Sequence, residues 1–307
     1  MRILLTGRNG QVGSELVRSL APFGEVHATG RADLDLADAD ALVAAVRALR
    51  PGLIVNAAAY TEVDRAESDP DAALAVNARA PRVLAEEAAR LGAPIIHYST
   101  DYVFDGEKEG PYLEEDAPGP LSVYGRSKLL GEEGVRAAGG PHLILRVAWV
   151  YGGRRRNFLT TMLELFTRRV EVAVVNDQTG SPSWCREIAG ATAEIILRAT
   201  KADSGLHDAL TEWGGTYHLP SSGHTTWYGF AEKIAEHLRR TDDRSLRLER
   251  LQPISSDEYR VTARRPRNSL LCGERVEERF GVTLPPWQEQ VVGCIDALTS
   301  RREVLVG

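Results

Sequence analysis

The sequence lacks the marks of several large classes of protein. Its cysteines, Cys185, Cys272 and Cys294, lie far apart and form no C-x-x-C pair, so neither a zinc site nor a disulfide framework is expected. No apolar run approaches the roughly 20 residues that span a bilayer, and the strand-like start leaves no room for a signal peptide. A formal charge of −6 is mild and gives no reason to expect nucleic acid. These absences predict a cytoplasmic protein with no membrane or nucleic-acid partner.

The first half of the sequence contains short apolar runs that alternate with helical patterns. Continuous apolar runs are typical of strands that are buried on both faces of a parallel sheet. The runs are 2–7, 25–30, 53–59, 94–100 and 142–150, and the helical patterns are 11–22, 38–49, 70–91 and 124–138. Together they predict an α/β fold with a Rossmann-like, doubly wound parallel sheet.

The second half is less regular. Amphipathic helical patterns at 156–169, 185–199 and 227–240 are separated by loops rich in Pro, Gly and Ser. We therefore predict two domains, an NAD(P)-binding domain at 1–150 and a smaller substrate-binding domain at 151–307. The segment 215–222 is strand-like and a candidate to return to the sheet, so the two domains are expected to interleave.

A glycine loop, "TGRNGQVG", joins the first predicted strand to the first predicted helix. Gly7, Gly10 and Gly13 let the turn tighten, let backbone N–H groups approach a pyrophosphate, and let the helix pack closely on the sheet. The spacing is not the G-x-G-x-x-G fingerprint, and a tight turn without a ligand is the alternative. The position of the loop, at the start of an alternating strand and helix pattern, favours nucleotide binding.

Two arginines point to the identity of the nucleotide. In many dinucleotide-binding sheets an acid near the end of the second strand grips the ribose 2′-hydroxyl. Here Arg31 follows that strand and Arg8 lies within the glycine loop. Guanidinium groups suit a 2′-phosphate, so the sequence favours NADPH, with NADH as the alternative. The alternative for Arg8 and Arg31 is that both are solvated surface residues with no cofactor role. Asp35 and Leu36 are placed to hold the adenine.

A phenol and an ammonium group are expected on one face of a helix, because Lys128 follows Tyr124 by one helical turn. A neighbouring charged lysine lowers the pKa of a phenol, so Tyr124 is predicted to be a proton donor for a carbonyl oxygen. Thr100 ends the fourth predicted strand, where its hydroxyl could polarise the same carbonyl. Ser99 should point the other way. Y-x-x-x-K alone is common, but the combination with Thr100 is much more specific.

These motifs resemble the extended short-chain dehydrogenase/reductase superfamily. Within it, the chain most resembles the dTDP-4-dehydrorhamnose reductase family, nearly from end to end. The segments that carry the resemblance are "GQVGSEL", "NAAAYTEVDRAE", "STDYVFDG", "YGRSKLLGE", "RVAWVYG", "NFL", "NDQTGSPSW" and "RPRNSLL".

The resemblance implies a role for each matching residue. Aromatic faces suit sugar and thymine rings, and hydroxyl and carboxylate groups suit sugar hydroxyls. Gly10, Gln11 and Val12 are implied to contact the pyrophosphate, and Asp35 and Leu36 the adenine. Other contacts with the dinucleotide are implied for Ala59, Tyr60, Thr61 and Tyr98. Tyr124 is implied as the proton donor and Lys128 as the ligand of the nicotinamide ribose. The resemblance implies that the substrate pocket is lined by Val63, Thr100, Asp101, Tyr102, Tyr124 and Trp149. Asn157 and Gln178 are further candidates. For Trp149 the alternative is a structural role in the hydrophobic core.

The implied reaction is NADPH-dependent reduction of the C4 ketone of dTDP-4-dehydro-β-L-rhamnose, and a homodimer is the implied assembly. Some members of the family bind Mg²⁺ through glutamates, to which Glu15 and Glu187 could correspond, but no metal is predicted here. A related dehydratase is disfavoured because Tyr102 stands where that family has a glutamate. An epimerase or reductase acting on another sugar nucleotide stays open, as does a regulatory NADP-binding subunit like the β subunit of methionine adenosyltransferase.

Overall fold

The computed structural model of the protein describes residues 1–241, 245–259 and 261–306. A six-stranded parallel sheet has the strand order β10-β5-β4-β3-β1-β2. The chain runs outward from β1 to β2 in one direction and from β3 to β10 in the other, so the predicted doubly wound sheet is confirmed. The strands are β1 (Arg2–Thr6), β2 (Glu25–Thr29), β3 (Leu53–Asn56), β4 (Ile95–Thr100), β5 (His142–Val147) and β10 (Gly215–His218).

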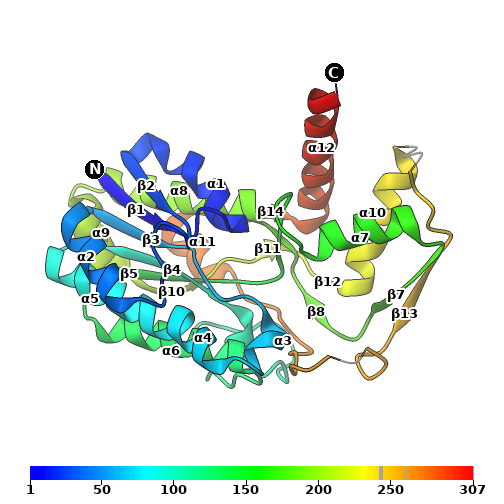
Figure 1. Ribbon diagram of the computed structural model, residues 1–307, viewed down its shortest axis with the longest axis horizontal. Helices are drawn as coiled ribbons and strands as arrows, with labels where there is room; N and C mark the ends of the chain where they lie inside the picture. Colours follow the sequence, from blue (N-terminus) through cyan, green and yellow to red (C-terminus); the bar gives the residue numbers. More distant parts are fainter. Residues whose placement is uncertain (242–244, 260, 307) are drawn as a thin grey trace.

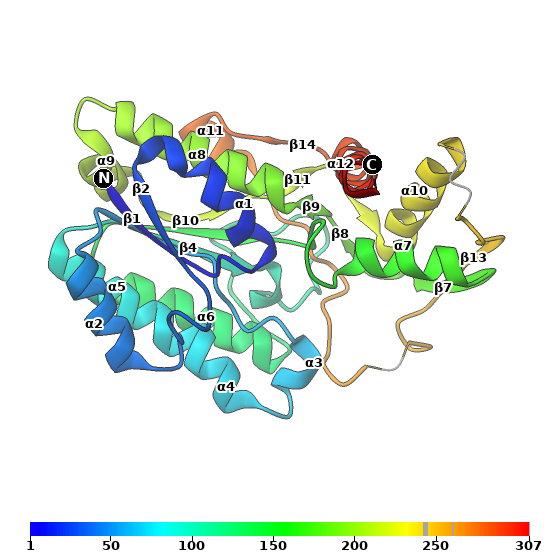
Figure 2. The same cartoon turned by 45° about the horizontal axis from the view of Figure 1, so that its top comes forward.

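Helices cover both faces of this sheet, as Figure 2 shows. One face carries α1 (Gln11–Ser19), α8 (Cys185–Lys201), α9 (Gly205–Trp213) and α11 (Glu274–Phe280). The other carries α2 (Ala39–Leu49), α5 (Ala80–Leu91) and α6 (Val123–Ala137), with the short α3 (Val63–Ala66), α4 (Pro70–Leu74) and η2 (Ala75–Arg79) beside them. Two 3₁₀ turns, η1 (Ala21–Phe23) and η3 (Asp101–Val103), follow α1 and β4.

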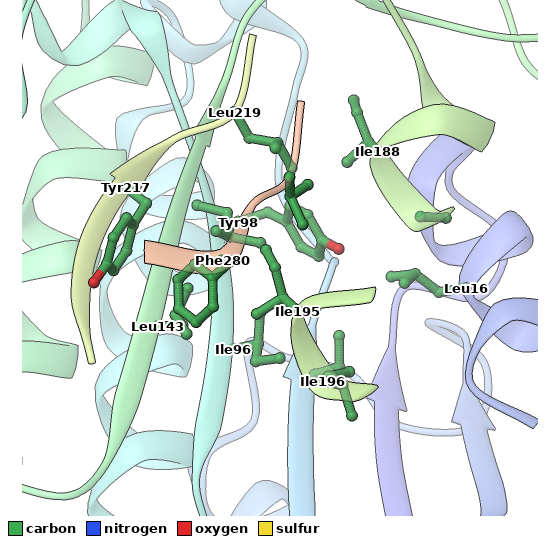
Figure 3. Packing of buried hydrophobic residues seen from close by; sticks show 14 of the residues in the cluster. Leu16, Ile96, Tyr98, Leu143, Ile188, Ile195, Ile196, Tyr217, Leu219 and Phe280 are labelled. Carbon is green, nitrogen blue, oxygen red and sulfur yellow. The ribbon is translucent and has the colours of Figure 1, made fainter. Parts of the chain in front are cut away.

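Each face of the sheet has its own hydrophobic core. On the α1 and α8 face, Leu16, Ile96, Tyr98 and Ile195 belong to one buried cluster, whose packing is shown in Figure 3. On the opposite face, a second cluster joins the sheet to α2, α5 and α6. Because both faces are covered, the central strands are apolar throughout, which explains the continuous apolar runs of the sequence.

A second lobe stands apart from the sheet in Figure 1. Its helices are α7 (Phe158–Arg168), α10 (Trp227–Arg240) and α12 (Trp287–Val306). Four two-stranded pairs complete it: β6 (Val150–Tyr151) with β9 (Ser183–Trp184), β8 (Thr179–Gly180) with β12 (Thr225–Thr226), β7 (Glu171–Val175) with β13 (Arg250–Ile254), and β11 (Ser221–Ser222) with β14 (Leu284–Pro286). A third buried cluster, which includes Phe166, Trp184, Phe230 and Val291, fills this lobe. In the described part of the chain, no helix is both long and apolar enough to cross a membrane.

The C-terminal half of the chain contributes to both lobes. β10 pairs with β5 at the edge of the sheet, and α8, α9 and α11 pack against the same sheet. The expected domain boundary near residue 151 therefore does not fully separate the two lobes, because residues beyond it supply one edge strand of the sheet and most of one helical layer.

A buried ion pair holds α6 to the sheet. The Glu132 carboxylate on α6 accepts hydrogen bonds from Arg146 on β5, at 2.9 and 2.8 Å, and from the more exposed Arg136, at 3.2 Å. Burial alone would raise the pKa of Glu132, but these arginines outweigh it and hold the pKa below its usual value. A paired buried carboxylate is tolerated, whereas an unpaired one is strongly destabilising.

We expect Arg146→Met to lower the free energy of unfolding by about 3–5 kcal/mol, because Glu132 would keep its charge without its buried partner. Arg136→Met is the matched control, since it removes the exposed partner of the same carboxylate and should cost less than about 1 kcal/mol. Denaturant unfolding of both variants is the measurement. Equal losses of unfolding free energy in the two variants would contradict the claim that the buried Arg146–Glu132 pair stabilises the fold more than the exposed Arg136–Glu132 pair.

Candidate active site

The helix α6 lies unusually close to its neighbours. It begins at Ser122, whose hydroxyl accepts a hydrogen bond from the Gly125 N–H at 3.1 Å. A Cβ on Gly125 would lie 2.1 Å from the carbonyl oxygen of Tyr102, and one on Gly131 would lie 2.1 Å from that of Asn77. These two glycines let α6 rest on the segments that follow β3 and β4, which brings its first turn to the carboxyl end of β4.

The Tyr124 side chain projects from this first turn and is 9% exposed. Its hydroxyl lies beside the Thr100 hydroxyl, and the Tyr102 ring packs edge-on against the Tyr124 ring with centroids 5.4 Å apart. Burial raises the pKa of Tyr124 to about 12, against a smaller opposite effect of Thr100. The lowered phenol pKa expected from the sequence is therefore wrong for this structure, because loss of solvation dominates and the nearby Asp101 raises the pKa further.

The Lys128 amine is almost completely enclosed, with 2% of the residue exposed. It donates a hydrogen bond to the backbone carbonyl of Tyr98 at 2.6 Å and lies 3.4 Å from His97 Nε2. Burial lowers the pKa of Lys128 to about 8, against the opposing charge of Glu132. A lysine that titrates near neutral pH is suited to an active site rather than to a surface.

Thr100 and Asp101 form the floor of the site at the end of β4. The Thr100 hydroxyl donates to Asp101 Oδ1 at 3.0 Å and accepts from the Tyr102 N–H at 3.3 Å. Burial raises the pKa of Asp101 to about 6, although hydrogen bonds with Ser269 and Thr100 oppose this. Ser99 faces Glu132, on the other side of the strand from Thr100, as alternation along a strand requires.

The glycine loop forms a cradle between β1 and α1. Gly7 has a φ of +80°, and a Cβ there would lie 2.7 Å from the Ala58 backbone nitrogen, in the segment that follows β3. A Cβ on Gly13 would lie 2.1 Å from the Gly7 carbonyl oxygen. Gly10 caps α1, so the free N–H groups of that helix point to the carboxyl end of the sheet. The cradle has the shape and polarity that a dinucleotide pyrophosphate needs.

Both predicted arginines lie beside this cradle. Arg8 donates to the Ala28 carbonyl at 3.0 Å and forms an ion pair with Asp33, also at 3.0 Å. Arg31 is largely exposed and lies 3.8 Å from Asp35. The structure thus places Arg8, Arg31 and Asp35 near the carboxyl ends of β1 and β2. The Arg8 guanidinium is held by Ala28 and Asp33, whereas the exposed Arg31 makes a longer contact, with Asp35.

The remaining cofactor candidates divide into those near the cradle and those in the core. Gln11 donates to the Val150 carbonyl and accepts from Asn157, so it connects α1 to the second lobe. The segment Ala59, Tyr60 and Thr61 follows β3 beside Tyr124, while Val12 packs between two hydrophobic clusters. The side chain of Leu36 lies in a hydrophobic core, and so does the ring of Tyr98, as Figure 3 shows. The backbone carbonyl of Tyr98 accepts a hydrogen bond from Lys128. Tyr98 was expected near the dinucleotide, but alternation along β4 turns its ring to the opposite face.

Trp149 lies at the junction of the two lobes with its ring stacked on Trp227. Their centroids are 3.6 Å apart and their planes differ by 7°. Trp149 has a φ of +47°, a left-handed conformation that is costly for a bulky residue. Gly180 allows this arrangement, since a Cβ there would lie 2.3 Å from the Trp149 ring. Gln178 accepts a hydrogen bond from the Trp227 indole at 3.2 Å, so it supports the stack.

A crossing segment, residues 261–271, reaches the site from the C-terminal part of the chain. Its Arg265 pairs with Asp64 at 2.7 Å and hydrogen-bonds Tyr102. Its Ser269 hydrogen-bonds Asp101. Sequence reasoning missed both contributions, and the one available signal was the "RPRNSLL" motif, which carried no assigned role. Val63, the last pocket candidate, begins α3 next to Asp64 and shares a hydrophobic cluster with Tyr60, Tyr102 and Tyr124.

Neither glutamate considered for Mg²⁺ belongs to a metal-binding group. Glu15 is ion-paired with Arg18 at 2.6 Å and with Arg186 at 3.6 Å. Over residues 1–241, 245–259 and 261–306, no group of three or more His, Cys, Asp or Glu residues is arranged to hold a metal ion.

The glycine cradle at the switch point of the sheet, together with Tyr124, Lys128 and Thr100 at the end of β4, defines a dinucleotide-dependent oxidoreductase of the extended short-chain dehydrogenase/reductase type. The chain matches the family described as "RmlD substrate binding domain" over residues 1–300. It is 46% identical to a dTDP-4-dehydrorhamnose reductase of Burkholderia thailandensis over 98% of this chain and 100% of that relative. The chain belongs to the dTDP-4-dehydrorhamnose reductase family.

Solved structures agree with this assignment. A dTDP-4-dehydrorhamnose reductase of Clostridium acetobutylicum, 35% identical, matches with a TM-score of 0.87 over 97% of this chain and 100% of that chain. The Bacillus anthracis reductase, solved in complex with NADP and 31% identical, matches with a TM-score of 0.86 over 96% and 99% of the two chains.

The raised pKa of Asp101 generates a pH-dependent prediction. Between about pH 4 and 6 the folded state holds a proton that the unfolded chain has lost, so this group makes the wild type less stable as pH rises. Asp101→Asn removes the buried charge and keeps hydrogen-bonding capacity. We expect the free energy of unfolding of the variant to rise relative to that of the wild type by up to about 3 kcal/mol between pH 4 and 7.

Asp105→Asn is the control for this prediction. Hydrogen bonds from the Glu107 N–H and Tyr112 hold the pKa of Asp105 below its usual value, so its charge stabilises the fold at neutral pH. The variant should therefore lose stability relative to wild type as pH rises through about 4. Denaturant unfolding across the pH range measures both variants. The same pH trend in both would contradict the assignment of Asp101 as a destabilised carboxylate.

Proposed function

We propose that the protein reduces the C4 ketone of dTDP-4-dehydro-β-L-rhamnose, with NADPH as reductant, and so forms dTDP-β-L-rhamnose. The observation that carries this proposal is the placing of the Tyr124 hydroxyl beside the Thr100 hydroxyl at the carboxyl end of β4, with the Lys128 amine one helical turn away. The names of the relatives, dTDP-4-dehydrorhamnose reductase in each case, support the choice of substrate.

The residues around the cradle fit the proposed cofactor. Free N–H groups at the start of α1 and the glycine cradle suit the pyrophosphate. Arg8 and Arg31 suit a 2′-phosphate at the ends of β1 and β2. Lys128, whose amine lies one helical turn from Tyr124, would suit a ribose hydroxyl. NADPH, when bound, supplies the hydride that adds to the ketone carbon.

Tyr124 would supply the proton. Its raised pKa keeps the hydroxyl protonated across the neutral range, so the phenol is ready to donate to a carbonyl oxygen on which negative charge develops. The Thr100 hydroxyl, which lies beside that of Tyr124, would hold the same oxygen. A protonated Lys128 would stabilise the phenolate that results, since an opposite charge nearby favours the ionised form.

The sugar nucleotide would lie between the two lobes. Asp101 and Thr100 offer hydrogen-bonding groups for sugar hydroxyls, and the Tyr102 and Trp149 rings offer apolar faces. Val63 borders the same cluster. An assembly of two chains, implied by the resemblance, stays a prediction.

The central prediction concerns Tyr124→Phe. General acid catalysis typically contributes about 10²–10⁴-fold, so kcat should fall by that much while the dissociation constant for NADPH changes little. The measurement is the loss of NADPH absorbance with the dTDP-linked 4-keto sugar. Tyr217→Phe is the control, since it removes, on the edge strand β10 of the sheet, a hydroxyl that donates to the Trp213 carbonyl. Full activity in Tyr124→Phe would reject the proton donor, and no oxidation by wild type would reject the substrate.

Cofactor preference is tested at Arg31. Arg31→Ala should raise the dissociation constant for NADPH about three- to tenfold and leave that for NADH nearly unchanged, because only NADPH carries the 2′-phosphate. Arg82→Ala is the control, since Arg82 forms a surface pair with Glu86 on α5, away from the cradle. A ratio of NADPH to NADH affinity that stays the same in Arg31→Ala would remove the role given to this residue.

A further inference from the structure

A row of buried polar side chains runs across the sheet and ends at Lys128. Thr6 on β1 is the register partner of Asn56 on β3, and Asn56 is the register partner of His97 on β4. All three side chains are wholly buried, at 0% exposure. Polar groups buried so deeply are costly unless they bond one another, so this row has a purpose beyond packing.

The distances along the row fix the direction of each hydrogen bond. The Thr6 hydroxyl lies 2.6 Å from Asn56 Oδ1, a separation typical of an O–H···O bond. The amide nitrogen of Asn56 therefore faces His97 Nδ1, at 3.1 Å, and donates to it. Because a neutral imidazole carries its proton on only one nitrogen, His97 must carry it on Nε2. This N–H points at the Lys128 amine, 3.4 Å away.

The geometry suits a neutral amine better than an ammonium group. A neutral amine has two N–H groups and a lone pair: the Tyr98 carbonyl accepts one N–H, the His97 N–H meets the lone pair, and one N–H stays free. An ammonium group has three N–H groups and no lone pair, so it could not accept the hydrogen bond from His97, and the two N–H donors would repel each other. The contact with His97 thus penalises the charged form of Lys128.

We propose that His97 is a positioning residue for Lys128: held by Asn56 and Thr6, it fixes the amine in place and favours its neutral form until the cofactor binds. Above about pH 8, where part of the free protein carries a neutral Lys128, the amine then takes a proton from solvent when the anionic cofactor enters, which completes the positive charge beside Tyr124. This inference rests on the proposed function to the extent that NADPH is the ligand.

The charges around the amine agree with this account. His97 stays neutral, because burial and then the Lys128 charge hold its pKa well below the usual value. Glu132, one turn further along α6, favours the ammonium form but shares its own charge with Arg146 and Arg136. The neutral side chains of Thr6 on β1 and Asn56 on β3 stand behind His97, and Tyr124 is an uncharged phenol. The lowered pKa of Lys128 leaves it able to gain a proton near neutral pH.

Proton uptake on cofactor binding tests the proposal directly. We would titrate NADPH into the wild type by calorimetry in buffers of different ionisation enthalpy, at about pH 8.5, just above the pKa of Lys128. The expected result is an uptake of roughly half a proton or more per NADPH bound, falling to near zero at about pH 6.5. The 2′-phosphate is already fully ionised at the higher pH, so it cannot supply this signal.

His97→Gln tests the role of the imidazole. A glutamine side chain can turn its oxygen towards Lys128 and accept from the ammonium group, which removes the penalty. Proton uptake at about pH 8.5 should fall to roughly one to two thirds of the wild-type value, and the alkaline limb of kcat/KM should move up by roughly 0.5–1 pH unit. Asn56→Leu removes the donor that sets the His97 tautomer and should shift both readouts in the same direction.

Ser99→Ala is the matched control. Ser99 lies on the same strand and the same face as His97 but faces Glu132, so its loss should change neither proton uptake nor the pH profile. Wild-type protein that binds NADPH without taking up a proton would overturn the inference even if the variants failed to fold. Uptake and pH profile unchanged in a folded His97→Gln would overturn it too. No binding of NADPH at all would instead reject the proposed function.

Discussion

The buried amine of Lys128 is the constraint on which the rest of the site depends. An amine with 2% exposure needs partners at short range, and it finds them in the Tyr98 carbonyl and the His97 ring. Both belong to β4, so α6 must lie against that strand, which Gly125 and Gly131 permit. Once α6 is seated there, its first turn brings the Tyr124 hydroxyl to the Thr100 hydroxyl without any further device.

The site is completed by parts of the chain that are far apart in sequence. The crossing segment brings Arg265 and Ser269 to Tyr102 and Asp101, across about half the length of the chain. Asp101 is held by hydrogen bonds from both lobes, although its charge is disfavoured by burial. The proposed catalytic groups therefore come from α6 and the end of β4, while the groups that hold the pocket together come from both halves of the chain.

The fold and the chemical groups could be predicted from the sequence, since apolar runs, glycine spacing and the Tyr124 to Lys128 interval are local patterns. The His97 row could not, because it depends on the register of three strands, which local patterns do not specify. Ser269 and Arg265 were missed because they reach the site from a loop segment far along the chain, and local patterns do not specify such contacts. Burial has two effects that the sequence did not show: the Tyr98 ring lies in the core, so its cofactor role stays a prediction, and the Tyr124 pKa is raised rather than lowered.

The most direct test of the account follows the hydride itself. NADPH carrying deuterium at the transferred position would be incubated with the protein and dTDP-4-dehydro-β-L-rhamnose, and the sugar nucleotide analysed by NMR and mass spectrometry. The account predicts that the deuterium appears at C4 of dTDP-β-L-rhamnose, in an amount equal to the NADPH consumed. Unlabelled sugar, label at another carbon, or NADPH that is bound but never consumed would contradict it.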